Sequence, residues 1–304
     1  MSSFGEPIDT ATAEAFASSW NSARDGSVYT REQFLEWFEP LGPTDFFGKS
    51  ILELGFGNGS LLFHMGDFGP SRLSGVELGD TLEKTGRNLS RLAPGIVDLH
   101  RGDLTTVELG LFDLVYSIGV LHHLREPDAG FRAMLRHTKP GGRFHGWVYA
   151  REGNGVIRLL VEPIRRAVCR LPWRITKYGF ALPFAVPFFL YAKFFRGLSG
   201  LLGRWQRLVA WVPLYRYCLW IAERRFPFFH HVAFDQLVTP QTAYLERQAI
   251  ERWLDDPQVD ASSVYLVFRN GNSWKFGGRK KPDPDQRPPA LAGGVSRTGS
   301  VRSG

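Results

Sequence analysis

The sequence predicts an α/β protein built on one mostly parallel sheet, and two observations support this. From residue 50 onward, short strand-like segments follow one another with helix-like segments between most of them. This alternation is typical of a parallel sheet covered by helices on both faces. Near the far end, two strand-like segments flank Asn270-Gly271-Asn272, a short hairpin signal that adds antiparallel strands. The chain's 304 residues suffice for one large domain or for a core with an elaboration.

The predicted elements begin with a helical cap. Its clearest signal is Thr30, followed three residues later by Gln33, a capping-box pattern ahead of an apolar stripe that Pro40 ends. Strands are then expected at residues 50–55, 72–77, 96–101, 111–117, 142–149, 264–269 and 273–276. Helices are expected around residues 58–66, 80–91 and 126–137.

The composition argues against several classes of protein. Hydrophobic residues make up 43% and charged residues 22% of the chain, as in ordinary soluble proteins. Cys169 and Cys218 are far apart, which argues against a disulfide framework and a thiolate zinc site, so we expect no metal. The N-terminus MSSFGEPIDTATAEAF lacks the basic and apolar regions of a secretion signal, so we expect a cytoplasmic protein.

Residues 151–230 break the strand–helix alternation. This segment holds 14 Lys and Arg against 3 Asp and Glu, together with 17 Phe, Trp and Tyr. Its most apolar part, FALPFAVPFFLYA at 180–192, is 13 residues long and contains two prolines, which we interpret as too short and too broken to cross a membrane. Residues 279–304 are rich in Pro, Gly, Ser and Arg and predict a disordered tail.

The stretch ILELGFGNGS at residues 51–60 carries the most chemical information. Glycines at 55, 57 and 59 follow a buried strand and let the turn press its backbone against a ligand. The spacing is not a dinucleotide fingerprint, which requires glycine where Ser60 stands. No Gly-Lys-Ser/Thr is present, so a nucleoside triphosphate is disfavoured.

Two carboxylates downstream of the glycines strengthen this interpretation. Glu77 ends the second strand, where a carboxylate can accept two hydrogen bonds from a ribose diol. Asp103 follows the third strand and is suited to receive an adenine amino group. The alternatives are a solvated strand end for Glu77 and a turn or cap residue for Asp103.

With these residues in view, residues 49–150 resemble a class I S-adenosylmethionine-dependent methyltransferase, of the broad group that includes ubiquinone- and menaquinone-biosynthesis enzymes. ELGFGNG is similar to that family's first motif, including its acidic residue. The resemblance implies S-adenosylmethionine as cofactor and a Rossmann-like seven-stranded sheet whose last strand inserts antiparallel. The residues that it implies for the cofactor are Glu53, Gly55, Phe56, Gly57, Asn58, Gly59, Glu77, Leu78, Asp103, Leu104, Ser117 and Ile118.

The same resemblance implies a role for each group. Glu53 and the loop 55–59 would hold the methionine part, Glu77 the ribose, and Asp103 with Leu104 the adenine. The Ser117–Ile118 backbone would hold the cofactor's amino group. The implied organisation is a helical N-terminal cap (1–48), a cofactor-binding core (49–150), a helical insert after the fifth strand (151–230), a C-terminal part of the core (231–278) and the tail (279–304).

The expected reaction is methylation of an oxygen or carbon of a small, largely apolar acceptor that is lipid-, quinone- or polyketide-like. SIGV at 117–120 lacks the Asp/Asn/Ser-Pro-Pro-aromatic motif of adenine or glutamine N-methylation. A base is needed only where the acceptor must lose a proton. The candidates are His122, His123, His230 and His231, with Asp235 and Tyr244 nearby in sequence.

Alternatives stay open for these histidines and for the activity. His122 and His123 could do no more than shape the pocket wall. Residues 230–244 could form a strand and turn in which the pair His230 and His231 is incidental. An RNA methyltransferase, a non-catalytic adenosyl-binding module and a nicotinamide oxidoreductase are the rival functions.

The basic, aromatic insert has three interpretations. Its aromatic side chains could cover an apolar acceptor while its cations meet lipid headgroups, which would make the protein membrane-associated. They could instead stack single-stranded RNA bases, although no recognisable RNA-binding module accompanies them. The third interpretation is a homodimer contact, since interfaces are enriched in aromatic residues and Arg; it is compatible with the first.

Overall fold

The structure is a computed structural model that describes residues 7–23, 25–202, 212 and 214–283. A seven-stranded sheet with the order β3-β2-β1-β4-β5-β7-β6 forms its centre. The strands are β1 (Ser50–Leu54), β2 (Arg72–Glu77), β3 (Val97–Arg101), β4 (Phe112–Ile118), β5 (Thr138–Tyr149), β6 (Tyr265–Arg269) and β7 (Ser273–Arg279). Strands β1 to β5 pair in parallel, and β7 runs antiparallel to both β5 and β6. The predicted fold class is therefore confirmed, including the antiparallel C-terminal hairpin.

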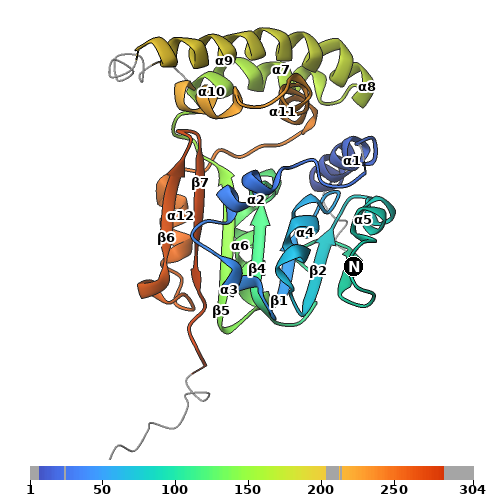
Figure 1. Ribbon diagram of the computed structural model, residues 1–304, viewed down its shortest axis with the longest axis vertical. Helices are drawn as coiled ribbons and strands as arrows, with labels where there is room; N and C mark the ends of the chain where they lie inside the picture. The colour runs from blue at the N-terminus through green and yellow to red at the C-terminus, as the bar shows by residue number, and fades with distance from the viewer. Residues whose placement is uncertain (1–6, 24, 203–211, 213, 284–304) are drawn as a thin grey trace, which may run out of the picture.

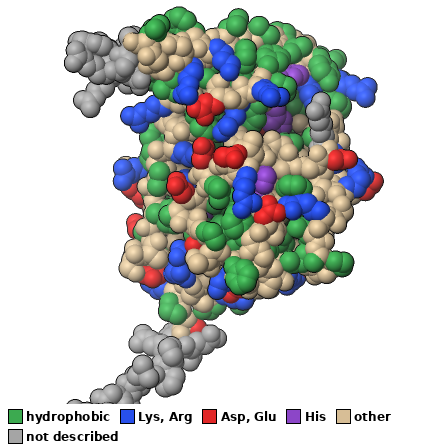
Figure 2. All heavy atoms as spheres, viewed as in Figure 1, with side chains coloured by type: hydrophobic (Ala, Val, Ile, Leu, Met, Phe, Trp, Pro, Cys, Tyr) green, Lys and Arg blue, Asp and Glu red, His purple; other side chains and the backbone are tan. Residues whose placement is uncertain are grey.

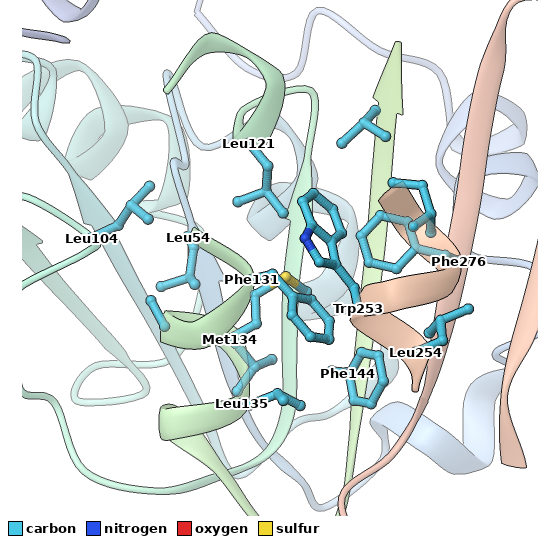
Figure 3. Packing of buried hydrophobic residues seen from close by; sticks show 14 of the residues in the cluster. Leu54, Leu104, Leu121, Phe131, Met134, Leu135, Phe144, Trp253, Leu254 and Phe276 are labelled. Atoms are coloured by element: carbon cyan, nitrogen blue, oxygen red, sulfur yellow. The ribbon is translucent and has the colours of Figure 1, made fainter. Parts of the chain in front are cut away.

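Helices cover both faces of this sheet (Figure 1). They are α4 (Ser60–Met65), α5 (Leu82–Leu89), α6 (Pro127–His137) and α12 (Arg247–Leu254). On one face, Phe131 of α6 stacks on Trp253 of α12 with 5.2 Å between the ring centroids, over Phe144 and Phe276 of the sheet (Figure 3). Ile51, Leu52 and Leu54 of β1 are all fully buried because both faces are covered.

The N-terminal helices α1 (Pro7–Asn21), α2 (Arg31–Phe38) and α3 (Pro43–Phe46) confirm the predicted helical cap. The capping box at the start of α2 is present: the Gln33 backbone N–H donates to Thr30 Oγ1 at 3.2 Å, and the Thr30 N–H donates to Gln33 Oε1 at 2.9 Å. Phe34 and Phe38 are fully buried in the apolar cluster on the second face of the sheet.

A helical layer lies across one end of the sheet, at the top of Figure 1. It consists of η3 (Ile157–Val161), α7 (Glu162–Val168), α8 (Trp173–Ile175), η4 (Thr176–Ala181), α9 (Leu182–Leu202), α10 (Tyr215–Ile221) and α11 (Phe226–Val238). The layer has its own apolar cluster, in which Ala181, Ala185 and Ala192 are packed with Phe229 and Phe234. It is therefore an elaboration with a separate core rather than a loop.

One expectation about this layer is wrong, and one open alternative does not describe it. Residues 173–201 form one helical stretch of 29 residues that is long and apolar enough to cross a membrane by length and composition alone, and only 22% of its apolar window is buried. Pro187 lies inside α9 without ending it. Its fixed φ is compatible with a helix, although it removes one backbone hydrogen bond. The alternative of a strand and turn at residues 230–244 does not hold for residues 230–238, which belong to helix α11 (Phe226–Val238).

The predicted boundary between core and tail at residue 279 differs from the structure. Strand β7 continues to Arg279, and Lys280 forms an isolated bridge with Val259. Residues 284–304 lie outside the described residues. The remaining predicted strands agree with the observed ones within about a residue, except that β5 begins at Thr138.

Candidate active site

A cavity of about 230 Å³ lies where the carboxyl ends of β1, β2 and β4 face helix α1 and the helical layer. This is the edge of an open parallel sheet at which ligands bind. The residues expected from the sequence that line it are Glu53, Gly55, Phe56, Gly57, Asn58, Glu77, Leu78, Leu104, Ile118, His123 and His231. Motifs from different parts of the chain thus meet at one place.

The glycine loop after β1 has a backbone that other residues rarely adopt. Gly55, Gly57 and Gly59 have φ angles of +85°, +55° and +74°. A Cβ on Gly55 would overlap the Val120 side chain, and one on Gly57 would lie 3.0 Å from Trp20 Nε1. Gly59 packs toward α5 instead, and it does not line the cavity. The first two glycines therefore shape the cavity wall, whereas the third fits the loop to a helix.

Glu77 ties the end of β2 to the glycine loop. Its Oε2 accepts a hydrogen bond from the Gly57 N–H at 3.0 Å, and its Oε1 accepts one from the Gly79 N–H at 3.0 Å. Burial raises the pKa of this carboxyl, while the two backbone donors act in the opposite direction. The carboxylate is thus a built part of the cavity and not a solvated strand end.

Glu53 forms the acidic floor of the cavity. Its side chain is 2% exposed, and its Oε2 accepts a hydrogen bond from the Tyr116 hydroxyl at 2.9 Å. Burial raises the pKa of Glu53 to about 8, and the charge of Glu77 adds to that rise. A cation placed beside Glu53 would stabilise its ionised form, whereas a pyrophosphate would be repelled by both carboxylates.

Besides Gly59, two of the expected cofactor residues lie off the cavity. Asp103 Oδ1 accepts hydrogen bonds from the Thr105 N–H at 2.8 Å and the Thr105 hydroxyl at 2.7 Å, the geometry of the turn-residue alternative. Its neighbour Leu104 does line the cavity. Ser117 is fully buried and its hydroxyl donates to the Leu54 carbonyl at 2.9 Å.

The four candidate histidines separate into two groups. His123 and His231 line the cavity. His122 is fully buried behind it, and burial lowers its pKa. His230 points into the helical layer, where its Nε2 donates to the Lys177 carbonyl at 2.9 Å.

The two cavity histidines differ in environment. His123 Nδ1 donates to the Gln241 carbonyl at 3.0 Å, and burial lowers its pKa to about 4. His231 Nε2 lies 3.3 Å from Asp235 Oδ2, one helical turn away on α11. Burial raises the pKa of Asp235, and the charge of His231 opposes that rise. The two groups are at ion-pair distance without a hydrogen bond between them. An imidazole next to a carboxylate is a candidate general base.

The sequence did not point to the aromatic wall of the cavity. It consists of Phe16, Trp20, Tyr29, Trp37, Trp147, Tyr149, Tyr217, Trp220 and Phe228. These side chains come from α1, the loop before α2, α2, β5, α10 and α11, so no local motif joins them. Arg269 also lines the cavity, with its guanidinium donating to Glu36 Oε2 at 2.7 Å. The available signal was the alternation in GWVY at the end of β5, which places Trp147 and Tyr149 on one face.

Residues 52–145 match a family model described as a methyltransferase domain. This chain carries a methyltransferase domain. The resemblance carried by ELGFGNG is confirmed for this part of the chain, and with it S-adenosylmethionine as the cofactor of a domain of this kind.

Curated relatives cover the same region. The chain is 32% identical over 121 residues to an uncharacterised protein of Synechococcus, which covers 38% of this chain and 28% of the relative. It is 30% identical over 119 residues to a ubiquinone biosynthesis O-methyltransferase of Bordetella avium, and this match covers 38% of this chain and 46% of the relative. It is 30% identical over 105 residues to a tRNA U34 carboxymethyltransferase of Idiomarina loihiensis, and this match covers 33% of this chain and 32% of the relative. The match thus spans less than half the length of each of these relatives.

Solved structures match more of the chain at lower identity. An O-methyltransferase family protein from Burkholderia thailandensis has a TM-score of 0.49 and 13% identity, covering 83% of this chain and 57% of that protein. The N-methyltransferase NodS from Bradyrhizobium japonicum has a TM-score of 0.46 and 12% identity, covering 88% and 98%.

Proposed function

We propose that this protein is an S-adenosylmethionine-dependent methyltransferase that methylates an oxygen or carbon of a small, largely apolar acceptor that is lipid-, quinone- or polyketide-like. One observation carries the proposal: a single cavity joins an acidic glycine loop to an aromatic wall. The acidic half suits a cationic cofactor, and the aromatic half suits an apolar acceptor.

The acidic half holds the cofactor through groups of this chain alone. S-adenosylmethionine, when bound, supplies a methyl group already activated on a sulfonium sulfur. Glu53 and the loop around Gly57 would hold its amino-acid part, Glu77 its ribose, and Leu104 would pack on its adenine. The positive charges of the cofactor favour ionised Glu53 over the protonated form that burial imposes.

The aromatic half orients the acceptor and excludes water. Trp20 of α1 and Tyr217 of α10 cover the cavity from two sides, while Trp147 and Tyr149 form its wall on β5. Since the methyl donor is already activated, alignment of the acceptor and removal of water supply most of the catalysis. Aromatic faces also attract the positive charge of a sulfonium.

His231 is the base in this proposal. Asp235 Oδ2 lies 3.3 Å from its Nε2, and both side chains line the cavity on the side of the helical layer. An acceptor hydroxyl or acidic carbon that enters the aromatic half would give its proton to the imidazole. His123, with its pKa lowered to about 4, stays neutral and shapes the wall.

An RNA acceptor is the second candidate, and the tRNA-modifying relative of Idiomarina loihiensis favours it. The cavity argues for a small molecule, because Arg269 is the sole Lys or Arg among its described lining residues and is paired with Glu36. Backbone phosphates of RNA would need several cations at the entrance.

Calorimetric titration of the full chain with S-adenosylmethionine, S-adenosylhomocysteine and NADH tests the cofactor. We expect binding of the two adenosyl ligands alone. Transfer of labelled methyl groups from the cofactor to apolar extracts, with total RNA in a parallel reaction, then tests the acceptor. Label in RNA alone would replace the small-molecule proposal, and cofactor binding without transfer to either would favour a non-catalytic adenosyl-binding module.

A further inference from the structure

A second cavity, of about 360 Å³, lies inside the helical layer. Ile157, Val161, Phe188, Ala233 and Leu237 are among its walls. None of the described residues that line it is charged, whereas the candidate active site is lined by several charged groups. Its chemistry is therefore that of a site for hydrocarbon.

The second cavity adjoins the candidate active site. Tyr149, Tyr217, Val232 and Asn272 line both cavities. Val232 follows His231 on α11, so the shared wall stands next to the base that we propose. A molecule with a reactive head and an apolar chain could therefore occupy both cavities at once.

The second cavity also reaches the outer surface of the layer. Leu160, Phe184 and Tyr191 line it and are themselves 56%, 39% and 38% exposed. They belong to a larger apolar face, on which Leu190 is 60% and Phe194 63% exposed. Figure 2 shows apolar and basic side chains side by side over this end of the molecule. Exposed apolar area on this scale marks an interaction surface.

Basic residues accompany this apolar face. Arg170 and Arg174 are exposed near the start of the helical stretch 173–201. Toward its end Lys193 and Arg196 are also exposed, but Lys193 Nζ donates to the Ala222 carbonyl at 2.6 Å and Arg196 pairs with Glu223 at 3.1 Å, so the start carries the free positive charge. The opposite side of α9 is packed against α10 and α11 through Ala185 and its neighbours. A helix with one packed side, one apolar side and basic flanks lies in the interface of an anionic bilayer.

We propose that the second cavity takes the hydrocarbon chain of an acceptor dissolved in an anionic bilayer, and that the outer face of α8–α9 rests on that bilayer. The acceptor enters past Phe184 and Tyr191 with its chain in the second cavity and its head between Tyr149 and Tyr217. This inference rests on the proposed function and narrows its acceptor to a lipid with a long apolar chain.

Chain-length dependence of binding tests the cavity directly. The probes are 4-alkylphenols with chains of increasing length, below their critical micelle concentrations, titrated into the full chain without cofactor. We expect affinity to rise about fourfold per methylene and then to level off when the cavity is full. Affinity that does not depend on chain length overturns the proposal.

Two filling variants locate the binding. Ala233→Phe places a ring in the second cavity from α11, and Ile157→Trp does so from η3 with less packing to disturb. In either folded variant, the affinity for long-chain alkylphenols should fall at least tenfold, whereas the affinity for S-adenosylhomocysteine should stay normal. Unchanged long-chain affinity in both would place the chain elsewhere and overturn the proposal.

Vesicle flotation tests the surface. The full chain should float with vesicles of phosphatidylcholine containing phosphatidylglycerol, and less with phosphatidylcholine alone. Leu190→Glu and Phe194→Glu should abolish flotation, whereas Phe47→Glu, at a residue 73% exposed on the core, should not. A dimer in vesicle-free solution that Leu190→Glu dissociates would assign the face to a second copy instead.

These readouts separate the two proposals. If the full chain does not bind S-adenosylhomocysteine, the proposed function is refuted, whatever its affinity for the alkylphenols. Normal binding of S-adenosylhomocysteine with no chain-length dependence would refute only this inference.

Discussion

The two halves of the candidate active site are built in different ways. The cofactor half consists of a loop whose backbone is set by Gly55 and Gly57, with one carboxylate beneath it and another beside it. The acceptor half consists of side chains from helices and strands far apart in sequence, such as Trp20, Tyr149 and Tyr217. The cofactor half therefore depends on local geometry, whereas the acceptor half depends on how the helical layer packs on the sheet.

The largest effect is expected from Gly57→Val. Gly57 has φ +55°, and its Cβ would lie 3.0 Å from Trp20 Nε1, so valine strains the loop and displaces α1 from the cavity. Calorimetry should show a loss of S-adenosylhomocysteine affinity of at least about 100-fold, or about 2.7 kcal/mol, which is comparable with the ~1–3 kcal/mol of backbone strain.

Gly110→Val is the matched control for this variant. Gly110 has φ +87° with nothing within 4 Å of its Cβ, and it lies outside the cavity. It should lose stability and keep its affinity. Normal cofactor binding by Gly57→Val would show that this loop is not the cofactor site.

His231→Ala should impair the acceptor half of the site and leave cofactor binding unchanged. If the histidine serves only the acceptor half, kcat falls by roughly 10²–10⁴-fold while S-adenosylhomocysteine affinity stays within about twofold. Steady-state kinetics with labelled cofactor measures the first quantity and calorimetry the second. His230→Ala, whose side chain bonds Lys177 inside the layer, is the neighbouring control and should turn over normally. Equal activity of the two variants would remove His231 as the base.

Glu53 predicts a pH dependence of the cofactor half. Its pKa of about 8 in the free chain means that it is mostly protonated at pH 7 and mostly ionised at pH 9. Because the cationic cofactor pairs with the ionised form, affinity should rise about tenfold over this interval. Glu53→Gln should bind weakly without this rise.

The ratio of the two affinities is the quantity to measure. The cofactor's own amino group titrates in both proteins, so its contribution cancels in the ratio of wild type to Glu53→Gln. A ratio that stays constant between pH 7 and pH 9 would mean that Glu53 does not face the cofactor's charge.

The difference between local geometry and tertiary packing also decides which features could be predicted from the sequence. The strand and helix pattern, the capping box at Thr30 and the position of the glycine loop follow from local periodicity and spacing, and the structure has all three. The roles of single cofactor residues stay predictions, and Asp103 shows why: a carboxylate after a strand also fits a turn, and here it bonds Thr105.

The helical layer was harder to predict for a physical reason. Helix α9 continues past Pro187, and its alanines pack against α10 and α11, a tertiary contact that no local rule contains. The aromatic wall was missed in the same way, because it brings Trp20 and Trp220 together from segments about 200 residues apart.

The smallest expected effect concerns how the layer is attached to the core. Trp220 Nε1 of α10 donates to Glu36 Oε2 of α2 at 2.9 Å, and Arg269 donates to the same oxygen. Trp220→Phe removes one of these bonds while keeping a ring in the wall, so it should cost about 1 kcal/mol, since Glu36 is partly exposed. For a domain of this size, that lowers the Tm by about 2–4 °C in a calorimetric scan.

Trp173→Phe, whose ring contacts Arg174 and Lys177 within the layer, is the control for the same change of side chain. If Trp220→Phe lowers the Tm and also weakens acceptor binding, with S-adenosylhomocysteine affinity unchanged, the position of the layer determines the acceptor half alone. If cofactor affinity falls with it, the two halves form one cooperative unit, and the distinction between a locally encoded cofactor half and a packed acceptor half does not hold in this protein.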